Sequence, residues 1–152
     1  MRKRVMNEGP AGDQPGLDLE QVASVEITSE DPAHPIEAAL RGDSGGWRAS
    51  TPGEQVIRLI FDQPARLRRI DLRFEEPGTS RTQEFVLRWS PDGGRSYREI
   101  VRQQYTFSPP GSTCEAERYA VDLAGVTVLE FRLIPDIAGG AALASLGRLQ
   151  VA

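Results

Sequence analysis

Short runs in which every second residue is hydrophobic dominate the chain from Val22 onward. Side chains alternate between the two faces of a β-strand, so each run predicts a strand with one buried face. In "RLRRIDLRF", for example, Ile70, Leu72 and Phe74 share one face, while charged residues occupy the other. The other runs are "VASVEIT", "QVIRLIFDQP", "EFVLRWS", "ERYAVDL" and "VTVLEFRLIP", and "ASLGRLQVA" is the expected last strand.

The segments between these runs are "DQP", "EEPGTS", "SPDGG", "FSPPGS" and "DIAGG", which are rich in turn-forming residues. Many short strands at this spacing predict an all-β fold, an antiparallel β-sandwich. Only "PIEAALRG" indicates a helix, of one or two turns ended by Gly42. Strands do not alternate with long helices, which argues against a parallel α/β sheet.

The most glycine-rich of these turns lies in "WSPDGGRSYREI", residues 89–100. A phosphate-binding loop would open a helix and carry GxxxxGK[ST] or GxGxxG, and neither pattern is present. Pro91 suits the second position of a turn, Asp92 can bond to its own downstream backbone, and Gly93 or Gly94 can adopt positive φ. The segment therefore predicts a β-hairpin.

Length, composition and charge narrow the possible domain organisation, partners and location of the protein. The 152 residues predict one domain at 22–152, preceded by a flexible arm at 1–21 that is rich in Gly, Pro, Asp and Gln. A net charge of −4, with arginines spread singly, argues against a nucleic-acid partner. Cys114 is the single cysteine, so no intrachain disulfide forms. The basic start has no apolar segment behind it, and no run could span a bilayer, so we expect a cytoplasmic protein.

Three longer segments combine these strands and turns: "EAALRGDSGGWRASTPGEQVIRLIFDQPARLRRIDLRF", "RTQEFVLRWSPDGGRSYREI" and "VLEFRLIPDIAGGAALASLGRLQV". They resemble discoidin domains, also called coagulation-factor type C domains. The resemblance covers the chain from about Val22 to Val151. It implies a jelly-roll sandwich of the galactose-binding-like type, in which loops at one end bind sugars, phospholipids or proteins and catalysis is rare.

The resemblance also raises the question of calcium. Relatives hold a structural calcium ion with the loop that matches "LRGDSGGW" and with a glutamate near the C-terminus. Asp43 is present in that loop, but Arg148 stands at the glutamate position. Calcium needs several oxygen ligands, and an arginine repels it. We therefore expect no calcium and no other cofactor, and we hypothesise that Arg148 pairs with Asp43 in place of the ion.

Three polar residues are candidate ligand contacts. His34, in "DPAHP", is the only histidine and cannot build a metal site alone. The resemblance implies contact with a sugar hydroxyl, and the alternative is an ordinary surface-loop histidine. Arg81 matches an often polar position of sugar-binding relatives. Glu76 lies in the turn before it, with a solvated turn as the alternative.

Aromatic side chains are the remaining candidates, because sugar C–H groups pack on aromatic faces. Trp89 shares the inward face of its run with Phe85 and is assigned to the core. Trp47 is either a ligand contact or a core residue. Tyr105 and Phe107 precede the Pro-rich turn and are the predicted exposed aromatic platform.

Together these observations predict a non-catalytic binding module that recognises carbohydrate through loops at one end of the sandwich. The alternative is a protein-interaction or assembly domain that uses the same loops. An enzyme such as a glycosidase is disfavoured, because the sequence pattern brings no pair of carboxylates together.

Overall fold

The computed structural model describes residues 16–43 and 45–152, and most of these residues lie in β-strands. Two short helices accompany them, α1 (Leu19–Val22) and α2 (Ile36–Arg41). The strands are β1 (Ala23–Ile27), β2 (Trp47–Arg48), β3 (Gln55–Glu75), β4 (Arg81–Ser90), β5 (Arg98–Phe107), β6 (Cys114–Ile134), β7 (Ser145–Leu146) and β8 (Arg148–Val151).

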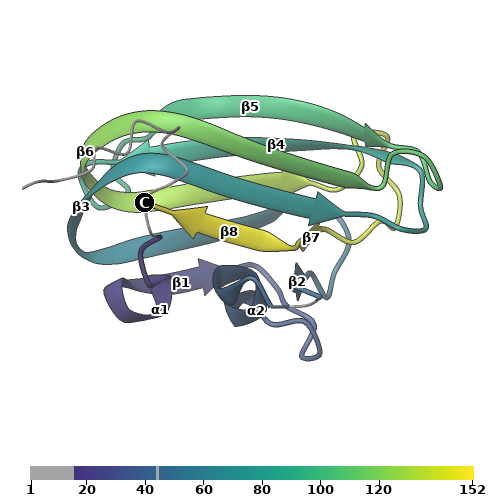
Figure 1. The fold of residues 1–152 in the computed structure, drawn as a ribbon, viewed down its shortest axis with the longest axis horizontal. Helices are drawn as coiled ribbons and strands as arrows, with labels where there is room; N and C mark the ends of the chain where they lie inside the picture. Colours follow the sequence, from purple (N-terminus) through teal and green to yellow (C-terminus); the bar gives the residue numbers. More distant parts are fainter. Residues whose placement is uncertain (1–15, 44) are drawn as a thin grey trace, which may run out of the picture.

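The strands form two facing layers (Figure 1). Paired strands run antiparallel in the order β1–β3–β6–β4–β5, and β8 pairs with the second half of β3. One layer holds β1, β4, β5, the first half of β3 and the second half of β6. The other holds β8, the second half of β3 and the first half of β6, while β2 and β7 form a separate pair. The predicted antiparallel β-sandwich is confirmed.

Strands β3 and β6 are each twice as long as the sequence predicts. We expected two strands in each region, with the turn "DQP" between those of the β3 region, and this expectation is wrong. Pairing continues through Pro64 and Gly125, with register shifts between Ile60 and Arg69 on β3. Such irregularities bend a strand without ending it. Both long strands therefore cross from one layer to the other, at the left of the view in Figure 1.

The predicted hairpin at 89–100 is confirmed as the turn between β4 and β5. Gly93 and Gly94 adopt φ of 74° and 92°, a region that glycine enters without steric cost. Asp92 accepts hydrogen bonds from the hydroxyls of Ser90 and Ser96. Led by the bond from Ser96, these contacts lower the pKa of Asp92 to about 2. The carboxylate thus supports the turn.

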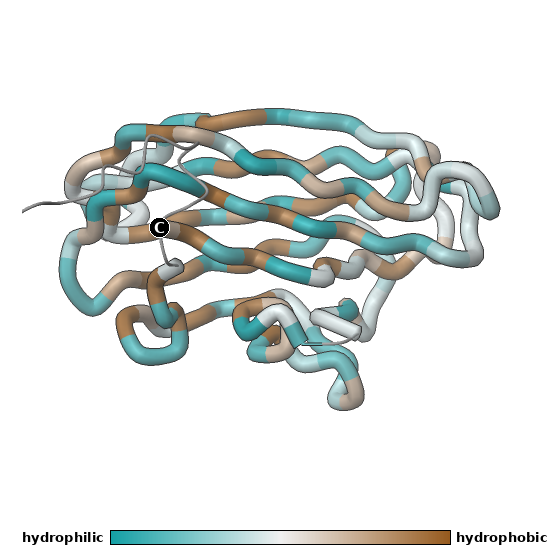
Figure 2. The backbone as a smooth tube through the Cα atoms, viewed as in Figure 1, coloured by the Kyte–Doolittle hydropathy of each residue, from teal (hydrophilic) through white to brown (hydrophobic). Residues whose placement is uncertain are grey.

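The core lies between the layers and is aromatic at its centre. Phe74 on β3 stacks against Phe85 on β4, with ring centroids 5.3 Å apart, and against Phe131 on β6 at 6.0 Å. Trp89, predicted to face inward, is 8% exposed. Hydrophobic and hydrophilic positions alternate along the strands, as Figure 2 shows. This alternation is why the period-two runs identify the strands correctly.

The helices close one edge of the core. Helix α2 ends as predicted at Gly42, which adopts φ of 73°. Helix α1 overlaps the end of the predicted flexible arm, yet Leu19 is 3% exposed and belongs to the core. The packed part of the chain therefore includes α1, and residues 1–15 of the predicted arm lie outside the described residues. Neither α1 nor α2 is long and apolar enough to cross a membrane.

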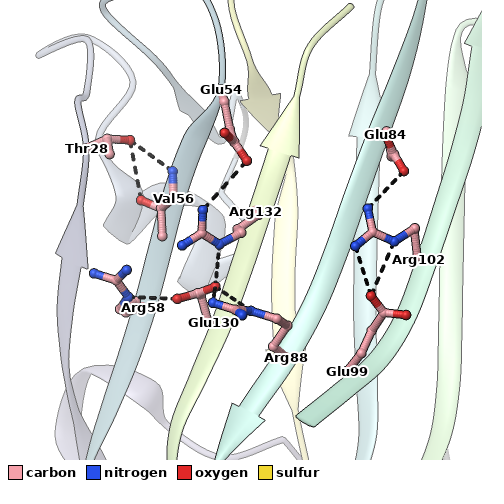
Figure 3. A network of polar contacts seen from close by, with 10 residues as sticks. All are labelled: Thr28, Glu54, Val56, Arg58, Glu84, Arg88, Glu99, Arg102, Glu130 and Arg132. Atoms are coloured by element: carbon pink, nitrogen blue, oxygen red, sulfur yellow. Dashed lines mark hydrogen bonds and ion pairs between the residues drawn. The ribbon is translucent and has the colours of Figure 1, made fainter. Parts of the chain in front are cut away.

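A network of charges covers the outer face of the layer that contains β4 and β5 (Figure 3). Its centre is Glu130 on β6, which is buried and accepts hydrogen bonds from Arg58, Arg88 and Arg132 at 2.6 to 2.9 Å. Burial alone would raise the pKa of Glu130, but the three arginines outweigh it and hold the pKa below its ordinary value. One carboxylate thus holds the guanidinium groups of three strands.

We expect Glu130→Gln to lower the free energy of unfolding by about 2 kcal/mol, measured by urea denaturation at neutral pH. Losing the charge leaves three guanidinium groups facing one another, and solvent moderates the cost because each is about one third exposed. The control is Glu99→Gln, which removes an exposed partner of Arg102 and should cost less than about 0.5 kcal/mol. Equal losses in the two variants would contradict this role of Glu130.

Candidate functional site

A pocket of about 390 Å³ opens where β3 ends and β8 begins. We call it the end pocket, and the end of β3 and the start of β8, which border it, lie towards the right in Figure 1. Side chains that carry or can carry charge line much of its wall. They are His34, Asp43, Arg48, Arg73, Glu75 and Arg148.

His34 enters the pocket from the loop before α2. Its backbone N–H donates to the carbonyl of Asp31 at 2.8 Å, and its carbonyl accepts from the N–H of Arg48 at 3.1 Å. Its imidazole packs against Gly45, where a Cβ atom would lie 3.2 Å from Nδ1. The backbone of His34 is thus fixed, whereas its half-buried ring makes no hydrogen bond to any residue the structure describes. An imidazole in this state can bond to a ligand that enters the pocket.

Arg48 is placed beside His34 by the short pair of β2 and β7. Trp47 points inward, with 0% exposure, and donates from Nε1 to the carbonyl of Ser29 at 3.1 Å. Arg48, the next residue on the strand, therefore points outward into the pocket. Within residues 16–43 and 45–152 its guanidinium forms no ion pair. Trp47 is a core residue, so its prediction as a ligand contact is wrong and the alternative interpretation holds.

Arg73 and Arg148 form the opposite wall. They are direct partners across the antiparallel pair of β3 and β8. Arg73 pairs with Glu75 at 2.6 Å, and both side chains are more than half exposed. Arg148 donates to Gln150, and its aliphatic stem lies 3.6 Å from where a Cβ of Gly42 would stand.

The donor set near Asp43 does not fit calcium. Among the described residues, no group of three carboxylate, imidazole or thiol side chains gathers to hold a metal ion. The arginine stem against Gly42 also brings a positive charge into the same loop. The hypothesised ion pair between Arg148 and Asp43 is not present in the described part of the chain, because Arg148 bonds to Gln150 instead.

Arg81 and Glu76 do not line the end pocket: Arg81 lies in the interior of the sandwich, and Glu76 is partly exposed in the turn before β4. Arg81 is 3% exposed and donates to Glu76 at 2.8 Å, to Gln83 and to the carbonyl of Pro135 at 2.7 Å. Burial would raise the pKa of Glu76, but the bond from Arg81 and two backbone N–H groups lower it. Arg81 holds the turn before β4 in place, and its burial argues against the predicted direct contact with a ligand.

Tyr105 and Phe107 do not form the predicted exposed platform. Phe107 is 0% exposed, packs edge-to-face with Tyr105 at 4.9 Å, and lies beneath the guanidinium of Arg81 at 4.8 Å. Tyr105 is half-buried and donates from its hydroxyl to the carbonyl of Cys114. Both rings belong to the inward face of β5, so the expectation of a platform is wrong.

Glu115 is a buried acidic residue whose contacts hold strands together. Glu115 is 2% exposed, and its two carboxylate oxygens accept from the amides of Gln83 at 3.0 Å and Gln103 at 3.1 Å. Burial, and secondly the neighbouring Glu117, raise the pKa of Glu115 to about 7. Because both oxygens are occupied, the residue links β4, β5 and β6 rather than meeting a ligand.

The structure therefore keeps His34 and Asp43 in one pocket and separates the other predicted residues from it. It adds Arg48, Arg73 and Arg148, which sequence reasoning did not select as ligand contacts. The alternation of "RLRRIDLRF" did place Arg73 on the outward face. Nothing in the sequence indicates that three arginines so far apart along the chain line one hollow.

The sequence itself matches no family model and no curated protein. Its fold, in contrast, matches solved structures at low sequence identity. The family 32 carbohydrate-binding module of C. perfringens NanJ, solved with galactose, is 13% identical with a TM-score of 0.63. The match covers 90% of this chain and 96% of that one.

Two further structures have the same fold. The family 32 module of AlyQ, in complex with 4,5-unsaturated mannuronic acid, is 16% identical over 86% of this chain and 95% of its own, with a TM-score of 0.62. A pectin-binding carbohydrate-binding module is 16% identical over 86% and 90%, also with a TM-score of 0.62. The chain therefore has the fold of the discoidin and galactose-binding-like β-sandwich domains, as its sequence motifs indicated.

Proposed function

We propose that this chain is a non-catalytic carbohydrate-binding module and that the end pocket holds a sugar residue. The observation that carries the proposal is that the His34 ring and the Arg48 guanidinium, which bond to no side chain or backbone group of the described residues, share one hollow of about 390 Å³. Sugar hydroxyls accept and donate hydrogen bonds, and imidazole, guanidinium and carboxylate groups match both roles. The modules with this fold named above were solved with a sugar or are described as binding pectin.

The chemistry of the pocket favours binding over hydrolysis. A glycosidase needs a carboxylic acid that stays protonated near neutral pH, and burial normally supplies that property. Glu75 is 57% exposed and paired with Arg73, and Asp43 is exposed. Neither carboxylate has the environment of a general acid.

Calorimetric titration with a panel of tetrasaccharides tests the proposal. We expect saturable binding to at least one glycan, and we expect His34→Ala and Arg48→Gln each to raise the Kd about tenfold by removing one hydrogen-bonding group. The matched control is Arg95→Gln, because Arg95 is exposed and lies in the β4–β5 turn at the opposite end of the sandwich. Its Kd should stay within about twofold. A flat response to every glycan would refute the proposed function.

A further inference from the structure

Two arginines that line the end pocket face each other directly across a strand pair. Arg73 on β3 and Arg148 on β8 are register partners in an antiparallel pair, a position in which like charges destabilise a sheet. Glu75 neutralises Arg73, whereas Arg148 forms no ion pair within the described ranges. The sheet thus carries an uncompensated positive charge at a position where hydrophobic or oppositely charged partners are normal.

The pocket as a whole is richer in arginine than in carboxylate. Arg48, Arg73 and Arg148 line it together with Asp43 and Glu75, so guanidinium groups exceed carboxylates even when His34 is neutral. The chain as a whole has the opposite balance, with a net charge of −4. The pocket lining therefore has an excess of positive charge in a protein whose net charge is negative, and such an excess attracts anions.

The same two arginines also line a second hollow. It has a volume of about 280 Å³ and lies on the outer face of β8, β3 and β6, and we call it the sheet-face hollow. Ala116 and Arg118 on β6 lie along its wall, and Arg118 is held by Asp71 at 2.7 Å. Arg73 and Arg148 thus stand between two adjoining hollows, in a position to meet a ligand longer than one sugar.

We propose that the ligand is an anionic glycan whose oxyanion, a uronate carboxylate or a sulfate ester, binds between Arg73 and Arg148. This inference rests on the proposed function and specifies its substrate class. Guanidinium groups bind carboxylate and sulfate oxygens through paired hydrogen bonds, and an anion between them removes their mutual repulsion. One sugar of the chain occupies the end pocket, and the next extends into the sheet-face hollow.

Three tetrasaccharides test this with the full chain: a galacturonate, a sulfated galactan and a neutral β-linked galactan. We expect the better of the two anionic glycans to bind at least about tenfold more tightly than the neutral one at low salt. The two anionic arms distinguish carboxylate from sulfate. Polyglutamate, an anion without sugar rings, should bind at least about tenfold more weakly than the preferred glycan.

Variants locate the anion. Arg73→Gln and Arg148→Gln should each raise the Kd for the anionic glycan about tenfold and leave the Kd for the neutral one within about twofold. The matched control is Arg66→Gln, since Arg66 is 55% exposed like Arg73 and is likewise paired with one carboxylate, that of Asp122. A second readout is thermal: Arg148→Gln removes the repulsion, so the anionic glycan should raise the Tm of this variant less than that of the wild type.

The outcomes separate the two proposals. Equal affinity for neutral and anionic glycans would overturn the anionic substrate class and leave the proposed function intact. Equal losses in Arg66→Gln and Arg73→Gln, or tight binding of polyglutamate, would overturn it too, because attraction would then be non-specific. If no glycan binds at all, the proposed function fails, and this inference fails with it.

Discussion

Replacing Gly46 with alanine should lower the free energy of unfolding by about 3 to 4 kcal/mol and abolish glycan binding. Gly46 is buried just before β2 and adopts φ of +54°, where an alanine is strained. A Cβ there would lie 2.3 Å from the carbonyl oxygen of Leu146 and 2.6 Å from Cα of Gly147. Both are backbone atoms, so the contact is relieved only by moving one chain segment away from the other.

That movement would reach the end pocket. Trp47 pairs with Leu146 in the two-residue ladder between β2 and β7, and Arg48 follows directly. Separating the two segments displaces Arg48 from His34 and opens the wall that Gly147 and Arg148 form. Stability and binding should therefore be lost together.

Urea denaturation and glycan titration measure the two effects, with Gly53→Ala as the matched control. Gly53 also has positive φ, at +87°, but apart from its chain neighbours no described residue places an atom within 4 Å of its Cβ position. Its substitution carries the backbone strain without the collision, so we expect a loss of about 1 kcal/mol and unchanged binding. Similar losses in both variants would show that the collision at Gly46 contributes nothing.

The second large effect is a decrease in stability as the pH rises from about 5 to about 8, caused by Glu115. The pKa of this carboxyl is raised to about 7 in the folded protein, above its ordinary value near 4.5. Between these two values the folded state binds more protons than the unfolded state. Stability contributed by the neutral form is therefore present at low pH and lost as the pH rises through about 7, by up to about 3 kcal/mol.

Glu115→Gln should flatten this dependence, because an amide does not titrate. The measurement is the free energy of unfolding in urea across this pH range, and the slope is compared rather than the absolute value. The absolute free energy of unfolding would change for a second reason, because the amide has one oxygen and cannot accept from both Gln83 and Gln103. As a control, Glu84→Gln removes an exposed ion pair with Arg102 and should leave the slope unchanged. Parallel curves for wild type and Glu115→Gln would refute the assignment.

The sequence predicted the strands because every second side chain of a strand in a two-layer sandwich is buried, which leaves an alternation of hydrophobic and polar residues in the sequence. It also predicted the short helix ended by Gly42 and the hairpin at Gly93, since glycine punctuation is a local signal. It did not predict that β3 and β6 run on through Pro64 and Gly125. A proline or glycine ends most strands and only bends some, and which occurs depends on the neighbouring strand.

The candidate site was less predictable. Arg81 stands four residues before Phe85, so the alternation of β4 already placed it on the inward face, and the resemblance to sugar-binding relatives pointed the other way. Phe107 likewise continues the alternation of β5, on the face that carries Gln103. The Pro-rich turn after it suggested instead that Phe107 lay in a loop. The arginines of the end pocket come from β2, β3 and β8, and only tertiary structure brings those strands together.

The pairing of β3 with β6 is nested. Its innermost partners, Glu75 and Cys114, enclose the segment that contains β4 and β5, and its outermost partners, Gln55 and Leu133, lie far apart in the chain. Closing so long a loop costs conformational entropy that is repaid only after distant contacts form. The central hairpin is the one large pairing that needs no such closure. We therefore expect assembly to spread outward from this hairpin, folding to be slow, and the pocket to be completed last, when β8 joins the sheet.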